Sequence, residues 1–423
     1  MVRAGTHCVG PFYALNLEIM NRKSILFASV SVIMLAMSEA NAQKSGFSYN
    51  FYGSVRNDVF YSTRQNQTSE EGSFYLFPLD KKYDTAGKDI NASGDLNLYN
   101  MRTRFGVNVT GPNIGSAKTS ANVEMDFRDS GSNVGILRVR HAYFNLDWGT
   151  SSLLLGQTWH PLYGTVSPEI LDINSGAPYN PDDRAPQIRY RYDNQGFMFT
   201  VTAAWQAQNK STGPNGSSSE YLRKSGVPEL FVGFDYHDQY LSAGIGAELM
   251  SLKFRDQSDL GYKVSERLTT ISPEVHLRYK DSKMLFAAKS YLTSNMTMLN
   301  TLGGYGVSSV DAHTGEMEYA PLRISHSWLN FAYGNQWRFN FLGGYAKNLG
   351  ATKNVTSLVG TGTKIDQLAS IVLGLSYNLS HFKFGAEYNW TTAWYGTPDA
   401  KARVKHTHSV DNHRLMLTTQ YIF

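Results

Sequence analysis

Cysteine, charge and long hydrophobic runs are all scarce in this sequence. Its 423 residues include one cysteine, Cys8, which excludes a disulfide framework and cysteine-rich zinc sites. Charged residues make up only 17% of the chain and form no long basic run, so we expect no nucleic-acid partner. The apolar stretch 24–37 is shorter than the roughly 20 residues that a membrane-spanning helix needs. Nothing in the sequence indicates a cofactor.

The N-terminal region has the pattern of a secretory signal peptide. A basic segment at 21–23 precedes the apolar stretch, and Ala40-Asn41-Ala42 supplies small residues for cleavage before Gln43. We therefore expect a signal peptide over 20–42, starting at Met20, and an upstream extension over 1–19. The exported part, 43–423, contains no cysteine, which is typical of the periplasm or the outer membrane rather than of a disulfide-stabilised secreted domain.

Residues 412–423 alternate in character with a period of two. One face carries Leu415, Leu417, Tyr421 and Phe423, whereas the other face is mostly polar and includes Arg414. A period of two predicts a β-strand. This strand ends in an aromatic residue that no further residue follows in the sequence.

The same period recurs along the chain, in about 16 segments. They are 47–63, 96–110, 117–128, 134–148, 151–160, 187–193, 197–206, 228–237, 240–254, 266–280, 283–294, 317–333, 336–348, 367–379, 381–395 and 408–423. Long and short connections alternate between them, as in outer-membrane barrels. One face of each segment is rich in Leu, Val, Phe, Tyr and Trp.

These patterns predict an all-β fold, a transmembrane antiparallel β-barrel of about 16 strands over 43–423. Counts of 14 or 18 strands are the alternatives. A soluble β-propeller or sandwich would need polar outer faces, and propeller strands are shorter than these segments.

A barrel of about 16 strands can hold a water-filled lumen. The loop 160–186 is long and contains several prolines, so we expect it to fold inward as a constriction, where charged side chains set ion preference. The predicted pore-lining and constriction residues are Arg56, Arg102, Arg104, Arg138, Arg140, Arg189 and Arg191 on strands, with Glu169, Asp172, Asp182 and Asp183 on the loop. Alternatively, the arginines pair with Asp58, Glu124, Asp126 and Asp193 and only keep the wall hydrated.

The segment 138–144 does not alternate cleanly, because Phe144 falls on the same face as Arg138 and Arg140. Two explanations are open at this point. The face contacts another protein rather than lipid, or a β-bulge shifts the alternation.

Several motifs together resemble a known family. The export signal, FYGSVRNDVFY (51–61), GQTWHPLYG (156–164) before the long loop, and QYIF (420–423) are similar to the trimeric 16-stranded porins of Gram-negative outer membranes, and among them to the DcaP-like porins. The resemblance implies a third external loop inside the pore, a homotrimer joined through apolar walls, and surrounding outer-membrane lipid. It also implies that Tyr421 and Phe423 are a signal for the barrel-assembly machinery. Residues 43–46 leave no room for the periplasmic coiled coil of some members, so their solute preference is not carried over.

The function that follows is passive diffusion of small hydrophilic solutes, with the arginine excess favouring anions, and no enzymatic activity. One alternative is a structural or adhesive barrel with a closed lumen. Another is a barrel hydrolase, which needs a nucleophile and base in hydrogen-bond reach.

We expect no energy-coupled transporter, because no plug domain precedes the first strand. His406, His408 and His413 form the densest histidine group, but their spacing matches no metal site.

Overall fold

The computed structural model describes residues 46–423, except residue 71 and residues 131–132. The predicted upstream extension (1–19) and signal peptide (20–42) lie outside these residues. The chain divides into two compact units, and the one described below is Tyr49–Phe423. Within the described residues, no helix is long and apolar enough to cross a membrane.

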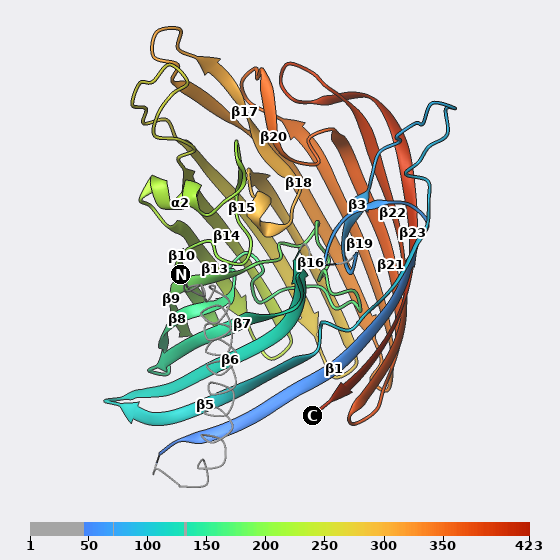
Figure 1. The fold of residues 1–423 in the computed structure, drawn as a ribbon. Helices are drawn as coiled ribbons and strands as arrows, with labels where there is room; N and C mark the ends of the chain where they lie inside the picture. Colours follow the sequence, from blue (N-terminus) through green and yellow to red (C-terminus); the bar gives the residue numbers. More distant parts are fainter. Residues whose placement is uncertain (1–45, 71, 131–132) are drawn as a thin grey trace, which may run out of the picture. The chain divides into compact units, whose positions relative to one another are not determined.

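Sixteen antiparallel barrel strands form a closed sheet in the described part of the chain. β1 pairs with β23 on one side and with β4 and β5 on the other, which closes the ring; Figure 1 shows β1 (blue) beside β23 (red). The barrel strands are β1 (Ser48–Ser62), β5 (Arg104–Ile114), β6 (Ala117–Ser130), β7 (Asn133–Asp147), β8 (Ser151–Trp159), β9 (Arg184–Asn194), β10 (Phe197–Ala204), β13 (Glu229–His237), β14 (Leu241–Leu252), β15 (Leu268–Lys280), β16 (Met284–Ser294), β18 (Met317–Tyr333), β19 (Trp337–Gly350), β21 (Ile365–Asn378), β22 (Phe382–Pro398) and β23 (Val404–Ile422). The predicted fold class is confirmed, and each predicted segment overlaps one of these strands.

Shorter elements extend the sheet or lie in the loops. β4 (Asp95–Tyr99), β17 (Gly303–Val310) and β20 (Ser357–Thr361) belong to the same sheet, whereas β2 (Asn66–Ser69) with β3 (Phe74–Pro78) and β11 (Thr212–Gly213) with β12 (Gly216–Ser217) form separate hairpins. The helical segments are α2 (Glu220–Ser225) and η2 (Thr297–Leu299).

The alternation of side chains along the strands follows the prediction. On β1, Asp58 is 2% exposed and faces the lumen, whereas the next residue, Val59, is 36% exposed on the outer face. Large apolar side chains occupy the outer face of the other strands too, as Ile245 and Ile271 illustrate. A continuous apolar exterior around a more polar interior is the surface pattern of a transmembrane barrel.

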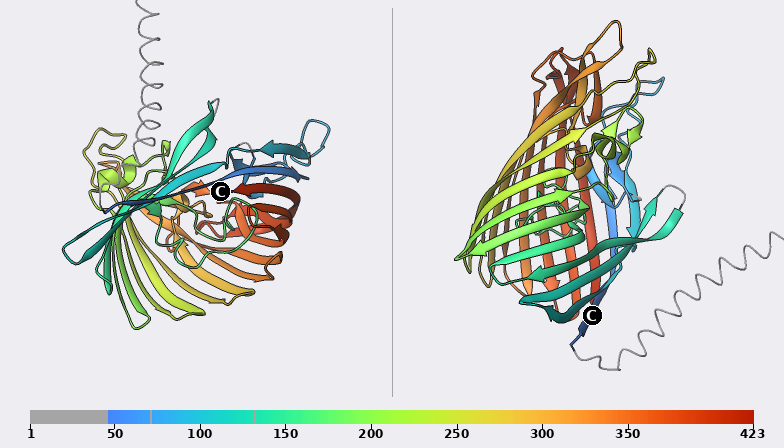
Figure 2. Two further views of the ribbon diagram at one scale, coloured as in Figure 1. Left: turned by 90° about the horizontal axis from the view of Figure 1, so that it is seen from below. Right: turned by 90° about the vertical axis from the view of Figure 1, so that its left-hand side faces the viewer.

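The long loop 160–183 folds inside the ring of strands, as predicted (Figure 2). It crosses to the wall opposite β8, where the Tyr179 hydroxyl lies 2.7 Å from the Ser370 hydroxyl and the indole N–H of Trp328 donates to Asn180. The loop packs so closely that a Cβ on Gly344 would lie 2.3 Å from the Tyr179 ring. Glycine at that position therefore permits the contact between loop and wall.

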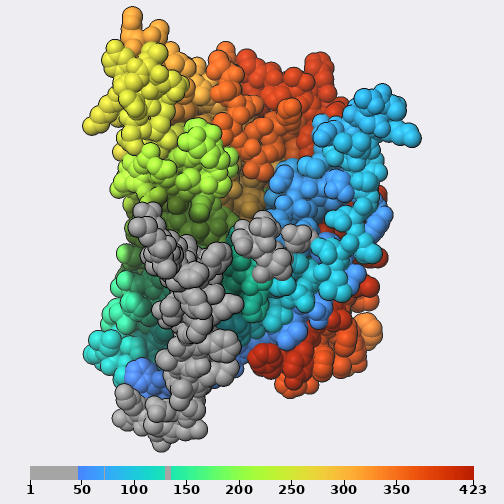
Figure 3. Space-filling view, viewed as in Figure 1, coloured from blue at the N-terminus to red at the C-terminus, as the bar shows by residue number. Residues whose placement is uncertain are grey.

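The hairpin β2–β3 also packs into the barrel interior, which the sequence analysis did not predict. Residues 74–77 (Phe-Tyr-Leu-Phe) are all buried. The side-chain amide of Asn174 donates to the Tyr75 carbonyl at 2.8 Å, so the hairpin contacts the 160–183 loop directly. Figure 3 shows the segment after β1 (blue) and the segment after β10 (light green) on the face turned to the viewer. The lumen is therefore narrowed by two segments, the 160–183 loop and the β2–β3 hairpin.

A β-bulge accounts for the broken alternation near Phe144. Glu124 on β6 pairs with His141, but its neighbour Met125 pairs with Val139, so Arg140 is the extra residue on β7. Because of the extra residue, Arg140 and the following His141 both face inward. The alternation is thereby shifted by one residue, and Phe144 is 47% exposed on the outer face.

Candidate functional site

A cavity of about 650 Å³ lies between the β5–β7 wall and the two inward-folded loops. Among the described residues its charged lining comprises Arg56, Arg102, Arg104, Arg128, Arg138, Arg140 and Arg184 as cations, and Glu70, Asp172 and Asp182 as anions. Arginine therefore dominates the charged lining of this cavity.

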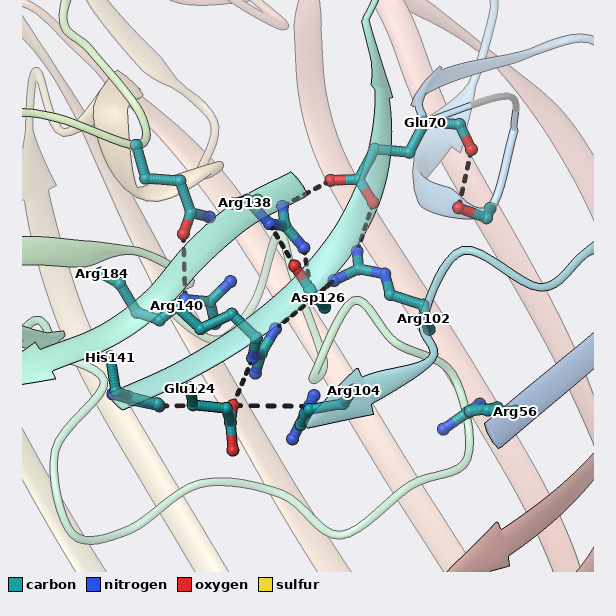
Figure 4. A network of polar contacts seen from close by, with 12 residues as sticks. Arg56, Glu70, Arg102, Arg104, Glu124, Asp126, Arg138, Arg140, His141 and Arg184 are labelled. Carbon is teal, nitrogen blue, oxygen red and sulfur yellow. Dashed lines mark hydrogen bonds and ion pairs between the residues drawn. The ribbon is translucent and has the colours of Figure 1, made fainter. Parts of the chain in front are cut away.

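Asp126 is the centre of the arginine cluster (Figure 4). Its carboxylate is 0% exposed and accepts two hydrogen bonds from Arg138, both at 2.7 Å, and one from Arg140 at 2.8 Å. Arg102 lies 3.7 Å from the same carboxylate. Pairwise attraction to one buried anion holds three mutually repelling guanidinium groups side by side.

Two further carboxylates complete this network. Glu124 accepts from Arg140 at 2.6 Å and lies 3.4 Å from Arg104. Glu70, from the loop after β2, bridges Arg102 and Arg138 at 2.6 and 2.9 Å (Figure 4). The alternative in which arginines pair with wall carboxylates thus holds for Glu124 and Asp126.

The other two predicted arginine partners, Asp58 and Asp193, differ in what they pair with. Asp58 pairs with Arg56 at 2.9 Å, whereas Asp193 pairs with His237 rather than with an arginine. The Arg56 guanidinium also donates to the Leu171 carbonyl of the loop at 2.6 Å. Arg56 therefore links the wall to the inward-folded loop.

Aromatic rings form one edge of the cavity. Trp159 stacks on Tyr163 at 3.9 Å, and the Arg184 guanidinium lies 4.2 Å from the Trp159 ring. Arg184 donates to the side chain of Gln208 at 2.9 Å, and among the described residues no carboxylate lies within 4.0 Å of it. The stacking on an aromatic face compensates part of the cost of burying this cation.

Three acidic residues of the loop, Asp172, Asp182 and Asp183, are buried. Burial raises the pKa of Asp172 and Asp182 above the ordinary value, and that of Asp183 well above it. Arg414, 3.4 Å from Asp172, opposes this effect. Burial therefore disfavours the charged form of these carboxyl groups.

The structure brings most, but not all, predicted site residues together. Those that line the cavity are Arg56, Arg102, Arg104, Arg138, Arg140, Asp172 and Asp182. Arg189 and Arg191 line a separate, much smaller space with Asp235. Glu169 pairs with Arg338, and Asp183, at the end of the loop, accepts a hydrogen bond from the Asn209 backbone N–H.

Several lining residues were missed by the sequence analysis. Arg128, Arg184 and Glu70 lie at or beyond the ends of predicted strands, where a period of two no longer indicates a side chain's direction. The apolar run 74–77 inside a polar loop was an available signal for the first inward-folded hairpin, since exposed apolar runs of this size are rare.

The predicted assembly signal lies at the seam that closes the barrel. The backbone N–H of Phe423 donates to the Gly53 carbonyl at 3.0 Å, and the Gly53 N–H donates back at 2.9 Å. The Tyr421 ring packs against Phe382 at 4.8 Å. Recognition of these residues by the assembly machinery stays a prediction.

The C-terminal histidines do not converge. His408 pairs with Asp80, and His413 contacts Tyr388. Among the described residues, the side chains with the spacing of metal ligands are His160, Glu229 and Glu248, elsewhere in the barrel.

No known family profile matches the sequence, and no curated protein matches it either. Solved structures do have a similar fold. The outer membrane channel DcaP of Acinetobacter baumannii is 19% identical, with 90% of this chain and 98% of that chain covered and a TM-score of 0.65. OmpT of Vibrio cholerae in its trimer form is 13% identical (90% and 100% covered, TM-score 0.54), and the anion-selective porin from Comamonas acidovorans is 11% identical (89% and 100% covered, TM-score 0.53).

At these identities the similarity establishes the fold alone. The chain has the 16-stranded antiparallel barrel of the porins. This confirms the fold that the resemblance to DcaP-like porins implied.

Proposed function

We propose that this protein is an outer-membrane porin through which small hydrophilic solutes, preferentially anions, diffuse passively. The observation that carries the proposal is the arginine-dominated cavity between the wall and the inward-folded loops. Positive side chains at a constriction attract anions and repel cations, and the low-dielectric barrel wall concentrates this field.

The most solvent-accessible cations set the selectivity in this proposal. The Arg104 side chain is 36% exposed and that of Arg56 16%, whereas the arginines around Asp126 are 8% exposed or less. Buried pairs hold the cluster together, while Arg104 and Arg56 face the solute. The proposal assigns no catalytic step to the chain.

The proposal includes the membrane location, the oligomeric state and the export and assembly signals of the protein. The apolar exterior suits outer-membrane lipid of a Gram-negative bacterium. The solved barrel of OmpT is described as a trimer and that of the Comamonas porin as anion-selective, which supports a homotrimer and anion preference here. Tyr421 and Phe423 would serve as the signal for the assembly machinery, and residues 20–42 as the export signal.

Planar-bilayer conductance under a salt gradient tests the proposal. The wild-type protein is expected to conduct and to give a reversal potential of anion-preferring sign. The double variant Arg56→Gln/Arg104→Gln is expected to shift the reversal potential toward cations, because it removes two accessible positive charges from the cavity.

The matched control is Arg189→Gln/Arg191→Gln, which removes the same charge from a space outside the cavity. Its shift should be clearly smaller. Equal shifts from the two double variants would contradict the proposed constriction. Protein shown to be inserted but silent would favour the structural or adhesive barrel instead.

A further inference from the structure

Three side chains from three elements converge at the start of the inward-folded loop. His160 directly follows β8, Glu229 begins β13, and Glu248 lies on β14. Glu248 pairs across the strands with Phe231, two residues beyond Glu229, so the two carboxylates are diagonal neighbours on one face. All three side chains are buried, with 1%, 2% and 0% exposure.

The spacing of their polar atoms suits a shared cation. Nε2 of His160 lies 3.3 Å from Oε2 of Glu229 and 3.2 Å from Oε2 of Glu248. One ligand atom from each residue lies within 4.8 Å of the others. Two ligands bound to tetrahedral zinc at about 2.0–2.1 Å are themselves roughly 3.3–3.4 Å apart. The observed spacing therefore needs little adjustment to hold a zinc ion.

The group also lacks the hydrogen bonds that buried charges normally have. Both oxygens of Glu248 and Nε2 of His160 are buried without a hydrogen-bond partner in the described structure. No Lys or Arg nitrogen among the described residues lies within 4.0 Å of Glu229 or Glu248. A protonated His160 would supply one positive charge for two buried carboxylates, whereas a divalent cation would neutralise both.

A second histidine–carboxylate group in the same barrel shows the contrast. Nε2 of His276 lies 2.8 Å from Asp235, and its Nδ1 lies 3.1 Å from Glu274. Both ring nitrogens are thus hydrogen-bonded, and no ring nitrogen is left as a ligand. The group at His160 differs because its Nε2 is shared by two carboxylates at the longer distances of 3.3 and 3.2 Å.

We propose that His160, Glu229 and Glu248 bind one divalent transition-metal ion of the zinc class. Imidazole nitrogen with carboxylate oxygen is a donor set typical of zinc. The Gln206 amide donates to Oε1 of Glu229 at 2.5 Å and leaves Oε2 for the metal, as outer hydrogen bonds commonly orient ligands. The ion would fasten the first residue of the inward-folded loop to β13 and β14, independently of what passes through the pore.

A proton competes with the metal at this site. Burial lowers the pKa of His160, but the two glutamates outweigh this effect and raise the pKa above its ordinary value. The Leu162 N–H donates to Nδ1 at 3.2 Å. Because Nδ1 accepts this hydrogen bond, the proton of the neutral ring is on Nε2. A metal bound at Nε2 would displace that proton to Nδ1, and the Leu162 amide would then give up its contact.

Equilibrium dialysis of the purified, chelator-stripped protein against zinc chloride, with metal analysis, tests the proposal. One zinc ion per chain is expected. Glu248→Gln should weaken binding by about 100-fold or more, since loss of a direct ligand exceeds the 10–100-fold typical of outer hydrogen-bond partners. Cobalt(II) bound at the same site should give the intense visible absorption of a tetrahedral complex.

His276→Asn and His408→Asn are the matched controls, and both should keep the zinc ion. Folding of Glu248→Gln is checked independently by its heat-modifiable migration and bilayer conductance. The proposal is overturned if the wild type binds no stoichiometric zinc, which would leave a proton on His160 as the sole cation of the site. It is equally overturned if Glu248→Gln binds zinc like wild type, or if His408→Asn is the variant that loses it.

Discussion

The two halves of the lumen are built from the same alternating strands but differ in what fills them. Beside β5–β7, arginines and carboxylates surround a cavity of about 650 Å³. Beside β16–β22, the inward-folded loops pack against the wall through a continuous apolar cluster that includes Val166, Tyr179, Trp328, Leu342 and Leu368. The loops therefore close one half of the barrel and leave the other half to water and ions.

This difference shows that the loops, rather than the strands, decide which part of the lumen is filled. Inward-facing residues of β18 and β21 such as Asn330 and Ser370 are compatible with a hydrated wall, yet Tyr179 of the loop packs against Ser370. Apolar loop residues select that wall because it offers Gly344 and small side chains at the contact. The arginine wall offers no such surface, and it stays polar.

The largest expected effect is at the centre of the charged half. Asp126→Ala removes the carboxylate shared by Arg138 and Arg140 and leaves the buried cations of the cluster with only Glu70 and Glu124 as anions. We expect a loss of about 3–5 kcal/mol in the free energy of unfolding, measured by urea titration in lipid vesicles. The control Asp193→Ala breaks a half-exposed pair with His237 and should cost about 0–1 kcal/mol. Similar losses in both variants would show that the cluster is not a buried network.

The next effect concerns the closed half. A Cβ at Gly344 meets the Tyr179 ring at 2.3 Å, whereas a Cβ at the adjacent Gly343 has its nearest neighbour at 3.6 Å. Gly344→Val should therefore cost about 1–3 kcal/mol through overpacking, and it should raise single-channel conductance by displacing the loop from the wall. Gly343→Val is the control and should do neither. If both variants behave alike, the loop does not pack on this wall in the membrane.

The smallest effect isolates one polar contact within the apolar half. Tyr179→Phe deletes the hydroxyl that lies 2.7 Å from Ser370 and leaves the ring in place. The expected cost is about 0.5–1.5 kcal/mol, with conductance unchanged. Tyr333→Phe, on the outer face where the residue is 53% exposed, should have a smaller effect on unfolding. A conductance change in Tyr179→Phe would mean that this hydroxyl holds the loop in position.

Sequence patterns were sufficient for the wall but not for the interior. The alternation of Asp58 and Val59 on β1 correctly predicted which faces the lumen. The disturbance at Phe144 was visible in the sequence, but the choice between an interface and a bulge needed the pairing of β6 with β7. Arg189 and Arg191 face inward as predicted, yet they lie outside the main cavity because the loop passes between the two regions.

The group at His160 illustrates why such sites escape sequence analysis. Its three members lie 69 and 19 residues apart along the chain, counting from His160 to Glu229 and from Glu229 to Glu248. No short spacing connects them, and each alone resembles an ordinary charged residue. Only the pairing of β13 with β14 and the inward turn after β8 place them together.

The sequence by itself determined the strands, their inward and outward faces and their order around a closed barrel. Local alternation is sufficient for this, because a one-residue shift of any strand would turn its apolar face into the lumen. The tertiary structure alone decided which half of the lumen is filled, which arginines share Asp126, and which carboxylates meet His160. These depend on where long loops pack against distant strands, and such long-range contacts have no period in the sequence.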